Sequence, residues 1–410
     1  MTTTESTTPV LTTSEEALRI AHSIAADIAA GAVERELNGT WPEEELRRVS
    51  ESGLLGIIVP ARFGGPDLPR ATAVEVLRIL AQADSAVGQL LLSHFVLNQA
   101  ITGLEDNDPA PRIYRDVLDG AQLGNATVER GTKRSIDRRT TVVRRDDGTW
   151  VLNGTKYYAT GTLGATWIAV AARIPGTDPD HGATVFVQPT DPGVTLNLDK
   201  WSSFGQQGTA SGEVVFDNVV VEDPFVIDEG PDPDPVTAPP AVLGAFDQAL
   251  HAAVDIGIAR AALEDGAKFV TTKSRPWFEA GLDSAAEEPH VVRRFGELTA
   301  RLYALEALLA QGANLVDEAL ALPELTREAA AEASLKVAAA KALAQEFAVE
   351  IASGIFELAG SSATDKKYAL DRHWRNVRVH SLHDPARWKY VHLGNYTLRG
   401  TKPPRLGVLL

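Results

Sequence analysis

TTVVRRDDGTWVLNGTKYYAT, residues 140–160, predicts a β hairpin in the middle of a chain whose flanks are patterned for helices. Val, Thr, Trp and Tyr favour strands, Asp147-Gly148 suits a tight hairpin turn, and Asn153-Gly154 indicates a second turn. Further stretches rich in Val, Ile and Thr, punctuated by Gly and Pro, continue to about residue 226. We therefore expect a central β domain over residues 121–227, which is a usual size for one domain.

Helical patterns lie on both sides of this β domain. Residues 14–120 and 241–410 carry apolar side chains at the i, i+3, i+4 and i+7 spacing of amphipathic helices. The longest runs are Ala241–Thr272, His290–Glu318 and Thr326–Gly360. Alanine dominates the last run, and small side chains permit close helix packing. The sequence thus predicts an α+β multidomain protein in which a β domain separates two helical ones.

Two segments are expected to lie outside these domains. Residues 228–240 (DEGPDPDPVTAPP) are acidic and rich in proline, which is typical of a linker or surface loop. Residues 1–13 are rich in Thr and Ser, which cannot build a core, and we expect a disordered tail there.

Composition narrows the possible functions. The chain has 410 residues with 55 acids against 39 bases, a formal net charge of −16, which argues against a nucleic acid or an anionic membrane as partner. It has no cysteine, which excludes disulfides, iron–sulfur clusters and a cysteine nucleophile. No apolar run is long enough for a membrane span, and the N-terminus does not resemble a secretory signal. We expect a soluble, acidic, cytoplasmic protein.

Motifs for nucleotides and metals are also missing. Neither the Gly-x-Gly-x-x-Gly dinucleotide motif nor the Gly-x-x-x-x-Gly-Lys-Ser/Thr phosphate loop occurs, so we expect no nicotinamide site. His380 and His383 lie three residues apart, but no third ligand is evident and we expect no metal. Imidazoles that titrate near neutral pH are suited instead to proton transfer.

Short motifs, in order along the chain, resemble those of the acyl-CoA dehydrogenase superfamily. They are Glu51–Gly56, Val59-Pro60 and Phe63–Gly65 in the first helical region, Val151–Lys156 in the hairpin, and Gly193-Val194 with Val215–Val219 further on. The resemblance covers nearly the whole chain. It implies an acyl-CoA dehydrogenase-like fold with an N-terminal helical domain, a central β-barrel-like domain and a C-terminal four-helix bundle, assembled as a homotetramer.

The segment Asp371–Pro385 (DRHWRNVRVHSLHDP) distinguishes branches of this superfamily. Acyl-CoA dehydrogenases typically carry a catalytic Glu here, in a Tyr-Glu-Gly-Thr motif, whereas this chain has His383-Asp384-Pro385. The segment, together with Ser93-His94 and Ser274–Trp277, resembles flavin monooxygenases of dibenzothiophene desulfurisation and their amine-hydroxylating relatives. That resemblance implies a two-component enzyme. A separate NAD(P)H-dependent flavin reductase supplies FMNH2, and dioxygen forms a C4a-hydroperoxyflavin that oxygenates a sulfur, nitrogen or activated aromatic carbon of a small, apolar or aromatic substrate.

The resemblance also implies roles for individual residues. His94 and His383 would manage protons, and Thr160 would face flavin N5. Taken alone, the apolar run around His94 is more typical of a core histidine, and Trp201 suits the core of the β domain equally well. The implied flavin contacts are Asn125, Thr127, Thr160, Trp201, Ser361, Ser362 and Arg275, the last reaching the phosphate from a neighbouring subunit. The expected substrate pocket includes Phe95, Trp277, Phe278 and His380.

Departures from the relatives leave alternatives open. Ser361-Ser362 stand where desulfurisation enzymes tend to carry an Arg, which leaves the phosphate ligands open, with FMN expected and FAD less so. Glu129-Arg130 add a charged pair near the expected mouth of the site, which would suit an amine substrate. Asp384 occupies the position of a catalytic base, so a nitroalkane-oxidase-like or acyl-CoA dehydrogenase-like enzyme of the same fold is the alternative. A flavin-binding scaffold without catalysis is a third reading.

Overall fold

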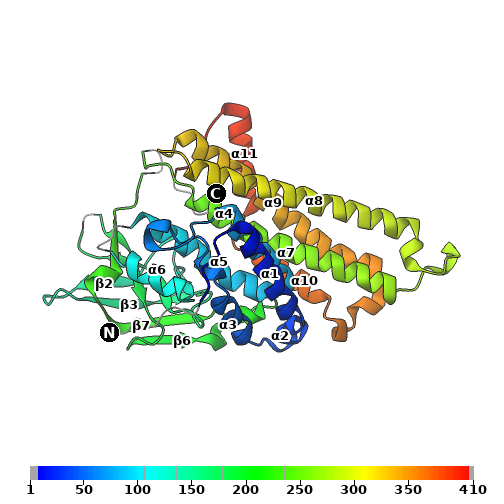
Figure 1. The fold of residues 1–410 in the computed structure, drawn as a ribbon, viewed down its shortest axis with the longest axis horizontal. Helices are drawn as coiled ribbons and strands as arrows, with labels where there is room; N and C mark the ends of the chain where they lie inside the picture. Colours follow the sequence, from blue (N-terminus) through cyan, green and yellow to red (C-terminus); the bar gives the residue numbers. More distant parts are fainter. Residues whose placement is uncertain (1–7, 105–107, 135, 178, 235–236, 406–410) are drawn as a thin grey trace.

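The structure is a computed structural model that describes residues 8–104, 108–134, 136–177, 179–234 and 237–405. Figure 1 shows the sheet at one end of the molecule, the N-terminal helices beside it, and long C-terminal helices that extend away from the sheet. The N-terminal helices are α1 (Ser14–Ala29), α2 (Ala32–Asn38), α3 (Glu43–Glu51), α4 (Arg70–Ala83), α5 (Ser85–Ala100) and α6 (Ala110–Leu118). This order confirms the predicted succession of a helical, a β and a second helical region.

The β domain is built on one eight-stranded sheet in the order β6-β7-β3-β2-β4-β5-β8, with β1 paired in parallel to β4. Its strands are β1 (Leu123–Ala126), β2 (Thr141–Arg144), β3 (Trp150–Tyr157), β4 (Trp167–Ile174), β5 (His181–Val187), β6 (Val194–Asn197), β7 (Glu213–Val221) and β8 (Val226–Gly230). Alternate side chains along the strands, such as Leu152, Val170 and Val185, point to the same side and form the apolar core of the β domain.

Asn153-Gly154 is not a turn, contrary to the sequence prediction. The hairpin of β2 and β3 turns around Asp147-Gly148 as predicted, but β3 then runs on through Asn153-Gly154. The register of β3 against β7 shifts between Leu152 and Gly154, which marks a β-bulge. A Cβ on Gly154 would lie 2.3 Å from the Thr140 hydroxyl oxygen. The glycine therefore permits a close approach of the backbone to Thr140.

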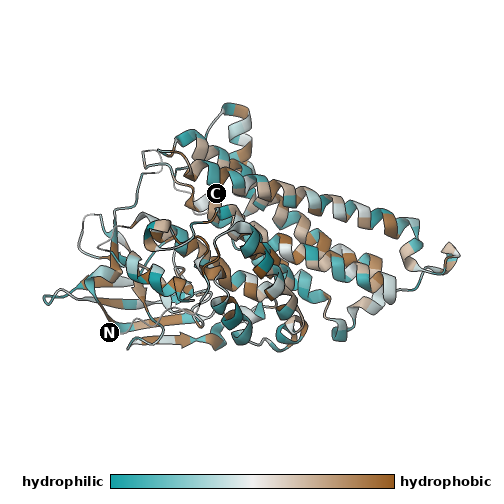
Figure 2. Cartoon of the chain, in the orientation of Figure 1, coloured by the Kyte–Doolittle hydropathy of each residue, from teal (hydrophilic) through white to brown (hydrophobic). Residues whose placement is uncertain are grey.

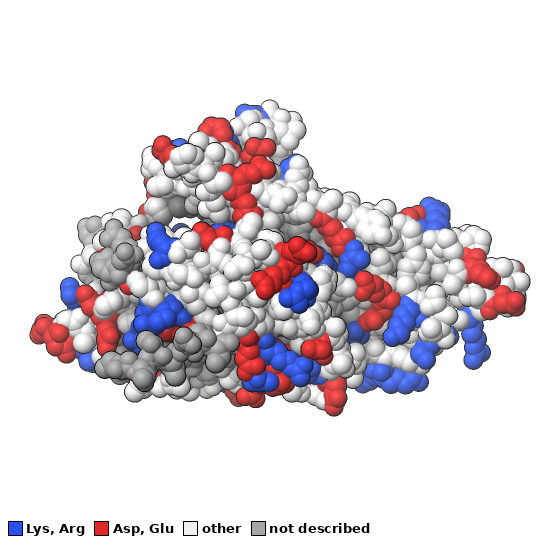
Figure 3. Space-filling view, in the orientation of Figure 1, with Lys and Arg blue, Asp and Glu red and all other residues white. Residues whose placement is uncertain are grey.

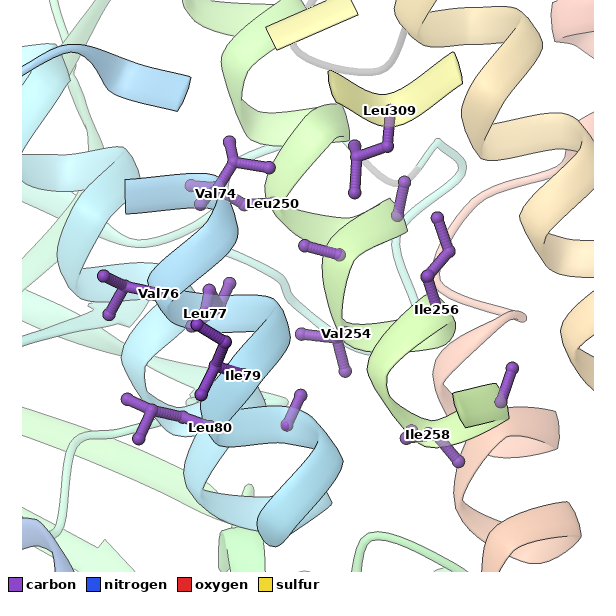
Figure 4. Close-up of a cluster of buried hydrophobic side chains, with 14 of the residues drawn as sticks. Val74, Val76, Leu77, Ile79, Leu80, Leu250, Val254, Ile256, Ile258 and Leu309 are labelled. Atoms are coloured by element: carbon purple, nitrogen blue, oxygen red, sulfur yellow. The ribbon is translucent and has the colours of Figure 1, made fainter. Parts of the chain in front are cut away.

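The C-terminal bundle confirms the three predicted long helices. Its helices are α7 (Leu243–Thr272), α8 (Pro289–Leu320), α9 (Arg327–Ala359), α10 (Asp371–His380) and α11 (Ala386–Arg399). Helix α7 is buried along most of its length, and Figure 4 shows its Leu250 and Val254 packed towards Leu77 of α4. Helix α8 carries alternating hydrophilic and hydrophobic bands (Figure 2), as expected for a helix that buries one face.

Two predicted boundaries shift in the structure. Leu11, within the expected tail, is buried in the N-terminal core, and Thr13 caps α1 by accepting the Glu16 backbone N–H, while residues 1–7 lie outside the described residues. The expected linker begins inside β8, which extends to Gly230, and residues 235–236 lie outside the described residues. No helix in the described part of the chain is long and apolar enough to cross a membrane.

Candidate active site

The loop between β6 and β7 joins the β domain to the C-terminal bundle. Gly205 lies so close to α10 that a Cβ there would be 2.3 Å from the Arg375 carbonyl oxygen. The Gln206 backbone N–H donates to Asn376 Oδ1 over 2.7 Å. Trp201 donates its indole N–H to the Gln206 carbonyl at 3.0 Å. These contacts fix the loop, with a half-buried Trp201, between the β domain and α10.

A row of amide and hydroxyl groups lies where the β domain meets α5. Asn125 on β1 donates from its side-chain amide to Ser93 Oγ at 3.0 Å, and its backbone N–H donates to the Thr160 carbonyl at 3.3 Å. The hydroxyls of Thr160 and Ser211 are 2.8 Å apart. Two residues predicted from the sequence, Asn125 and Thr160, are thus neighbours, and Ser93 and Ser211 extend the polar row.

These groups fit the edge of a flavin ring. Amides and hydroxyls can bond its carbonyls and ring nitrogens, and Trp201 offers an aromatic face. Gln206 contributes a fully buried side-chain amide whose nitrogen and oxygen have no hydrogen-bond partner among the described residues. Buried polar atoms of this kind require a bonding group. Thr127, also predicted to contact flavin, is exposed just beyond β1.

His94 is fully buried and bonded on both sides of its ring. Its Nε2 lies 2.8 Å from the Leu55 carbonyl oxygen, and its Nδ1 accepts the Leu123 backbone N–H at 3.2 Å. Nε2 therefore carries the hydrogen and Nδ1 the lone pair. Burial lowers the pKa of His94 to about 4, against the opposing effect of the Leu55 hydrogen bond. His94 is thus neutral at physiological pH and ties α5 to β1 beside Asn125.

His383 lies on the loop between α10 and α11, with 41% of its side chain exposed. Its ring stacks on that of His251 from α7, with centroids 3.8 Å apart. Its Nδ1 lies 3.7 Å from the Asp384 carboxylate. A partly exposed imidazole over a buried polar residue is within reach of a bound ligand and suited to proton transfer.

Asp384 is engaged as a structural carboxylate. It is buried and forms an ion pair with Lys389, while its backbone carbonyl accepts from Gln345 Nε2 at 2.9 Å. Burial opposes its ionisation, but nearby His383 and the charges of Lys341 and Lys389 outweigh burial and lower the pKa of Asp384 far below its usual range. A carboxylate that is stabilised in this way is a poor proton acceptor. This does not favour the nitroalkane-oxidase-like alternative, which needs Asp384 as a base.

The predicted phosphate ligands gather at the far end of the bundle. Ser274 Oγ donates to the Ala359 carbonyl at 2.9 Å, which brings Arg275, after α7, beside Ser361 and Ser362, after α9. All three ligands are exposed. Figure 1 shows the α7–α8 connection at the end remote from the sheet, and on the face shown in Figure 3 Lys and Arg are frequent at this end. Within one chain these residues are distant from Asn125 and Thr160.

The four residues predicted for a substrate pocket lie in different surroundings. His380 is buried inside the bundle with both ring nitrogens bonded, so it faces the bundle interior. Phe95 is buried edge-to-face against His94. Trp277 and Phe278 are 60% and 77% exposed at the far end of the bundle, so within one chain they line no pocket with His383.

Glu129 is committed to the interior of the β domain, which corrects its assignment to an amine substrate. Its carboxylate lies 2.6 Å from Lys156 Nζ and accepts the backbone N–H groups of Arg139 and Thr140. Burial alone would raise the pKa of Glu129, but the bonds from Lys156 and Thr140 outweigh it and lower the pKa. Arg130 remains exposed, over the rings of Tyr157 and Tyr158.

Sequence reasoning missed the residues beneath His383. Asp247, His251 and Asp255 recur every fourth residue in the run LGAFDQALHAAVDIGIA of α7, which apart from them and Gln248 is apolar, and Lys341 faces them from α9. Polar residues at this spacing share one helix face, which is the signal that could have found them. No group of three or more His, Asp or Glu in the described residues is arranged to hold a metal ion.

Comparison with known proteins identifies the family. Models of the acyl-CoA dehydrogenase N-terminal, middle and C-terminal domains match residues 14–103, 129–219 and 249–388. The helical, β and helical regions of the structure coincide with these three matches. The chain belongs to the acyl-CoA dehydrogenase family.

Within this family the chain is similar to flavin-dependent monooxygenases. It is 34% identical to the dibenzothiophene monooxygenase of Rhodococcus qingshengii, over 94% of this chain and 93% of the relative. It is 30% identical to a probable FMNH2-dependent monooxygenase, SfnC, of Pseudomonas putida, over 96% and 98%. The crystal structure of TdsC from Paenibacillus sp. A11-2 with FMN and indole has a TM-score of 0.89 at 29% identity and covers 96% of this chain and 100% of that chain. These relatives confirm the predicted monooxygenase branch and fold.

Proposed function

We propose that the protein is a two-component, FMNH2-dependent monooxygenase that transfers one oxygen atom of O2 to a sulfur, nitrogen or activated aromatic carbon of a small substrate. His383 carries this proposal. A partly exposed imidazole stands on the loop where acyl-CoA dehydrogenases keep their catalytic Glu, and the adjacent Asp384 is held in a buried ion pair. An imidazole can give and take protons near neutral pH, whereas this loop offers no free carboxylate to act as a base.

FMN is the cofactor that these residues would hold. Asn125, Thr160 and Ser211 would bond the ring edge while Trp201 packs against the ring, and the TdsC complex with FMN supports this choice over FAD. Arg275 would bind the phosphate, because a guanidinium can donate two parallel hydrogen bonds to it, with Ser361 and Ser362 adding hydroxyl donors. Bound in its reduced form, FMN would activate dioxygen, which is the source of the transferred oxygen atom.

The chain's own residues would position the substrate, exclude water and move protons. His94, bonded to backbone groups on both sides, would hold Ser93 and Asn125 at the ring edge. His383 would exchange a proton with the reacting atoms from its exposed ring face. An apolar or aromatic substrate is the class that we assign, and the indole in the TdsC complex is of that class.

Two partners follow from this function. The chain carries no nicotinamide-binding motif, so an NAD(P)H-dependent flavin reductase in the same cytoplasm must supply FMNH2. The phosphate ligands lie at the far end of the bundle, whereas the ring-binding residues lie where the β domain meets α5, so we assign Arg275 to the site of a neighbouring subunit in a homotetramer. Exposed Trp277 and Phe278 beside Arg275 are apolar surface that such an interface would cover. A light-scattering mass of one subunit would contradict the assembly.

The test combines the protein with FMN, NADH, a flavin reductase and ¹⁸O₂, and offers dibenzothiophene, indole and aromatic amines. Mass spectrometry should find a product carrying one labelled oxygen from at least one of these substrates. His383→Ala should lower product yield while hydrogen peroxide is still released, and Arg387→Ala, an exposed residue nearby, should leave both unchanged. Dye reduction by an acyl-CoA, or peroxide formed from a nitroalkane without the reductase, would rule this function out.

A further inference from the structure

A chain of buried polar side chains runs through the bundle beneath His383. Lys341 Nζ on α9 lies 2.6 Å from Asp255 Oδ2 on α7, and His380 Nδ1 on α10 lies 2.7 Å from Asp255 Oδ1. His380 Nε2 in turn lies 3.1 Å from His251 Nδ1. All four residues are buried, so these contacts are little screened by water.

Asp255 determines which nitrogen of each histidine carries a hydrogen. Burial opposes its ionisation, but Lys341 and His380 outweigh burial and lower the pKa of Asp255, so that it accepts from His380 Nδ1. A neutral His380 then has its lone pair on Nε2, which accepts from His251 Nδ1. The lone pair of His251 is left on Nε2.

His251 Nε2 faces a second acceptor. It lies 3.7 Å from Asp247 Oδ1, in the preceding turn of α7, and both side chains are buried. This distance is too long for a direct hydrogen bond, but a lone pair and a carboxylate still repel one another across the gap. A proton on either Asp247 or His251 removes this repulsion, so the arrangement calls for one proton on the pair.

The charges around this gap support the same requirement. The charged and titratable groups that face it are Asp247 and Asp255 on α7, Lys341 on α9, His380 on α10, His383 and Asp384 on the loop, and Lys389 on α11. Three carboxylates against two ammonium groups leave one net negative charge when every histidine is neutral. One further proton makes the cluster neutral, which burial favours.

Below about pH 6 the proton at this gap resides on Asp247. Burial raises the pKa of Asp247 to about 6, despite the opposing charge of His383. Burial, together with the charges of His383 and His380, lowers the pKa of His251 well below its usual value.

We propose that Asp247 and His251 hold one exchangeable proton, and that the charge of this pair controls when His383 is an acid. This inference rests on the proposed function, in which His383 exchanges protons with the reacting atoms. When the gap loses its proton, one negative charge lies beneath His383 and favours its imidazolium form. When the gap takes up a proton from solvent, this negative charge is cancelled and no longer acts on His383. Asp255, His380 and Lys341 are positioning residues that fix the ring orientations.

Infrared spectroscopy of the protein without flavin tests the proton store directly. A protonated, buried Asp247 should give a carboxylic acid C=O band that disappears as the pH rises through about 6 and that shifts in D2O. Asp247→Asn should lack this band, whereas Asp119→Asn, which alters an exposed carboxylate, should keep it. Absence of the band below that pH, or its persistence in Asp247→Asn, would overturn the proposal. Because no flavin or substrate is present, the result does not depend on the monooxygenase activity.

Turnover gives a second readout. Asp247→Asn removes the negative charge beneath His383, so the basic limb of the pH profile of kcat should move to lower pH by about one unit. Asp119→Asn should leave the limb in place. A uniform fall in kcat with an unmoved limb would show that Asp247 acts through packing alone. If Asp247→Asn fails to fold, Asp247→Leu has similar volume, needs no polar partner, and carries the same two expectations.

Discussion

Glu129→Gln separates a structural role of Glu129 from a role in substrate binding. The change keeps the size of the side chain and removes its charge. Lys156, none of whose side chain is exposed, would lose the carboxylate that lies 2.6 Å from its Nζ. The backbone N–H groups of Arg139 and Thr140 would share one amide oxygen in place of a carboxylate.

The loss of folding stability in Glu129→Gln follows from the burial of the Glu129–Lys156 pair. Removing one partner of a buried ion pair costs about 3–5 kcal/mol, because the remaining charge has no compensation. Gln Oε1 still accepts one hydrogen bond, so we expect the lower half of this range, about 3–4 kcal/mol at pH 7. Unfolding has an entropy of about 2.1 cal/mol/K per residue, so over 410 residues a loss of that size lowers the thermal midpoint by roughly 4 °C.

Calorimetry and urea unfolding measure the loss, and Glu222→Gln, at an exposed position, is the matched control. A double change, Glu129→Leu with Lys156→Met, should recover most of the stability because it removes both buried charges. The KM values for amine and neutral substrates should change by the same factor. An unchanged midpoint together with a raised KM for amines alone would refute the structural role.

Three further perturbations address the site and the fold. Gly205→Ala places a methyl group 2.3 Å from the α10 backbone, so the affinity for FMN, measured by equilibrium dialysis, should fall at least about tenfold. Gly394→Ala, with open space around its Cβ, should leave this affinity unchanged. Buried His94 and His373 have pKa values of about 4 in the fold, against 6.5 in the unfolded chain. The stability that they contribute, about 3 kcal/mol each, is therefore present above pH 6.5 and is lost as the pH falls through 4. A urea midpoint that does not fall between pH 7 and pH 4 would contradict this. Arg275→Ala should weaken FMN binding about tenfold or more and leave the affinity for riboflavin, which lacks the phosphate, unchanged; equal losses for the two ligands would remove Arg275 from the phosphate site.

Local patterns predicted most of the fold. The three long helices appear within a few residues of their predicted ends, because helical periodicity and the breakers that stop it lie within the segment itself. Asn153-Gly154 has the composition of a turn, but its conformation depends on pairing with β7, which is more than fifty residues away in the chain. Composition alone does not reveal such a bulge.

Residues of the candidate site could be proposed where the segment carried its own signal. Resemblance to family motifs indicated a loop for His383 and assigned Asn125 and Thr160 to the flavin. Partners distant in the sequence were not predictable. Glu129 binds a lysine 27 positions away and His380 an aspartate 125 positions away, and residue type does not distinguish a buried ion pair from an exposed one. The same limit explains why His380 was assigned to a substrate pocket.

Helix α7 connects two parts of the chemistry that lie far apart. Asp247 and His251 are near its first turns, and Arg275 follows its last residue, Thr272. The rise of about 1.5 Å per residue separates His251 from Thr272 by roughly 32 Å along one continuous helix, which is buried as far as Ala259 and partly exposed beyond it. In the proposed homotetramer one helix would thus carry the proton store of its own subunit and, just beyond its end, the phosphate ligand of a neighbouring subunit's site.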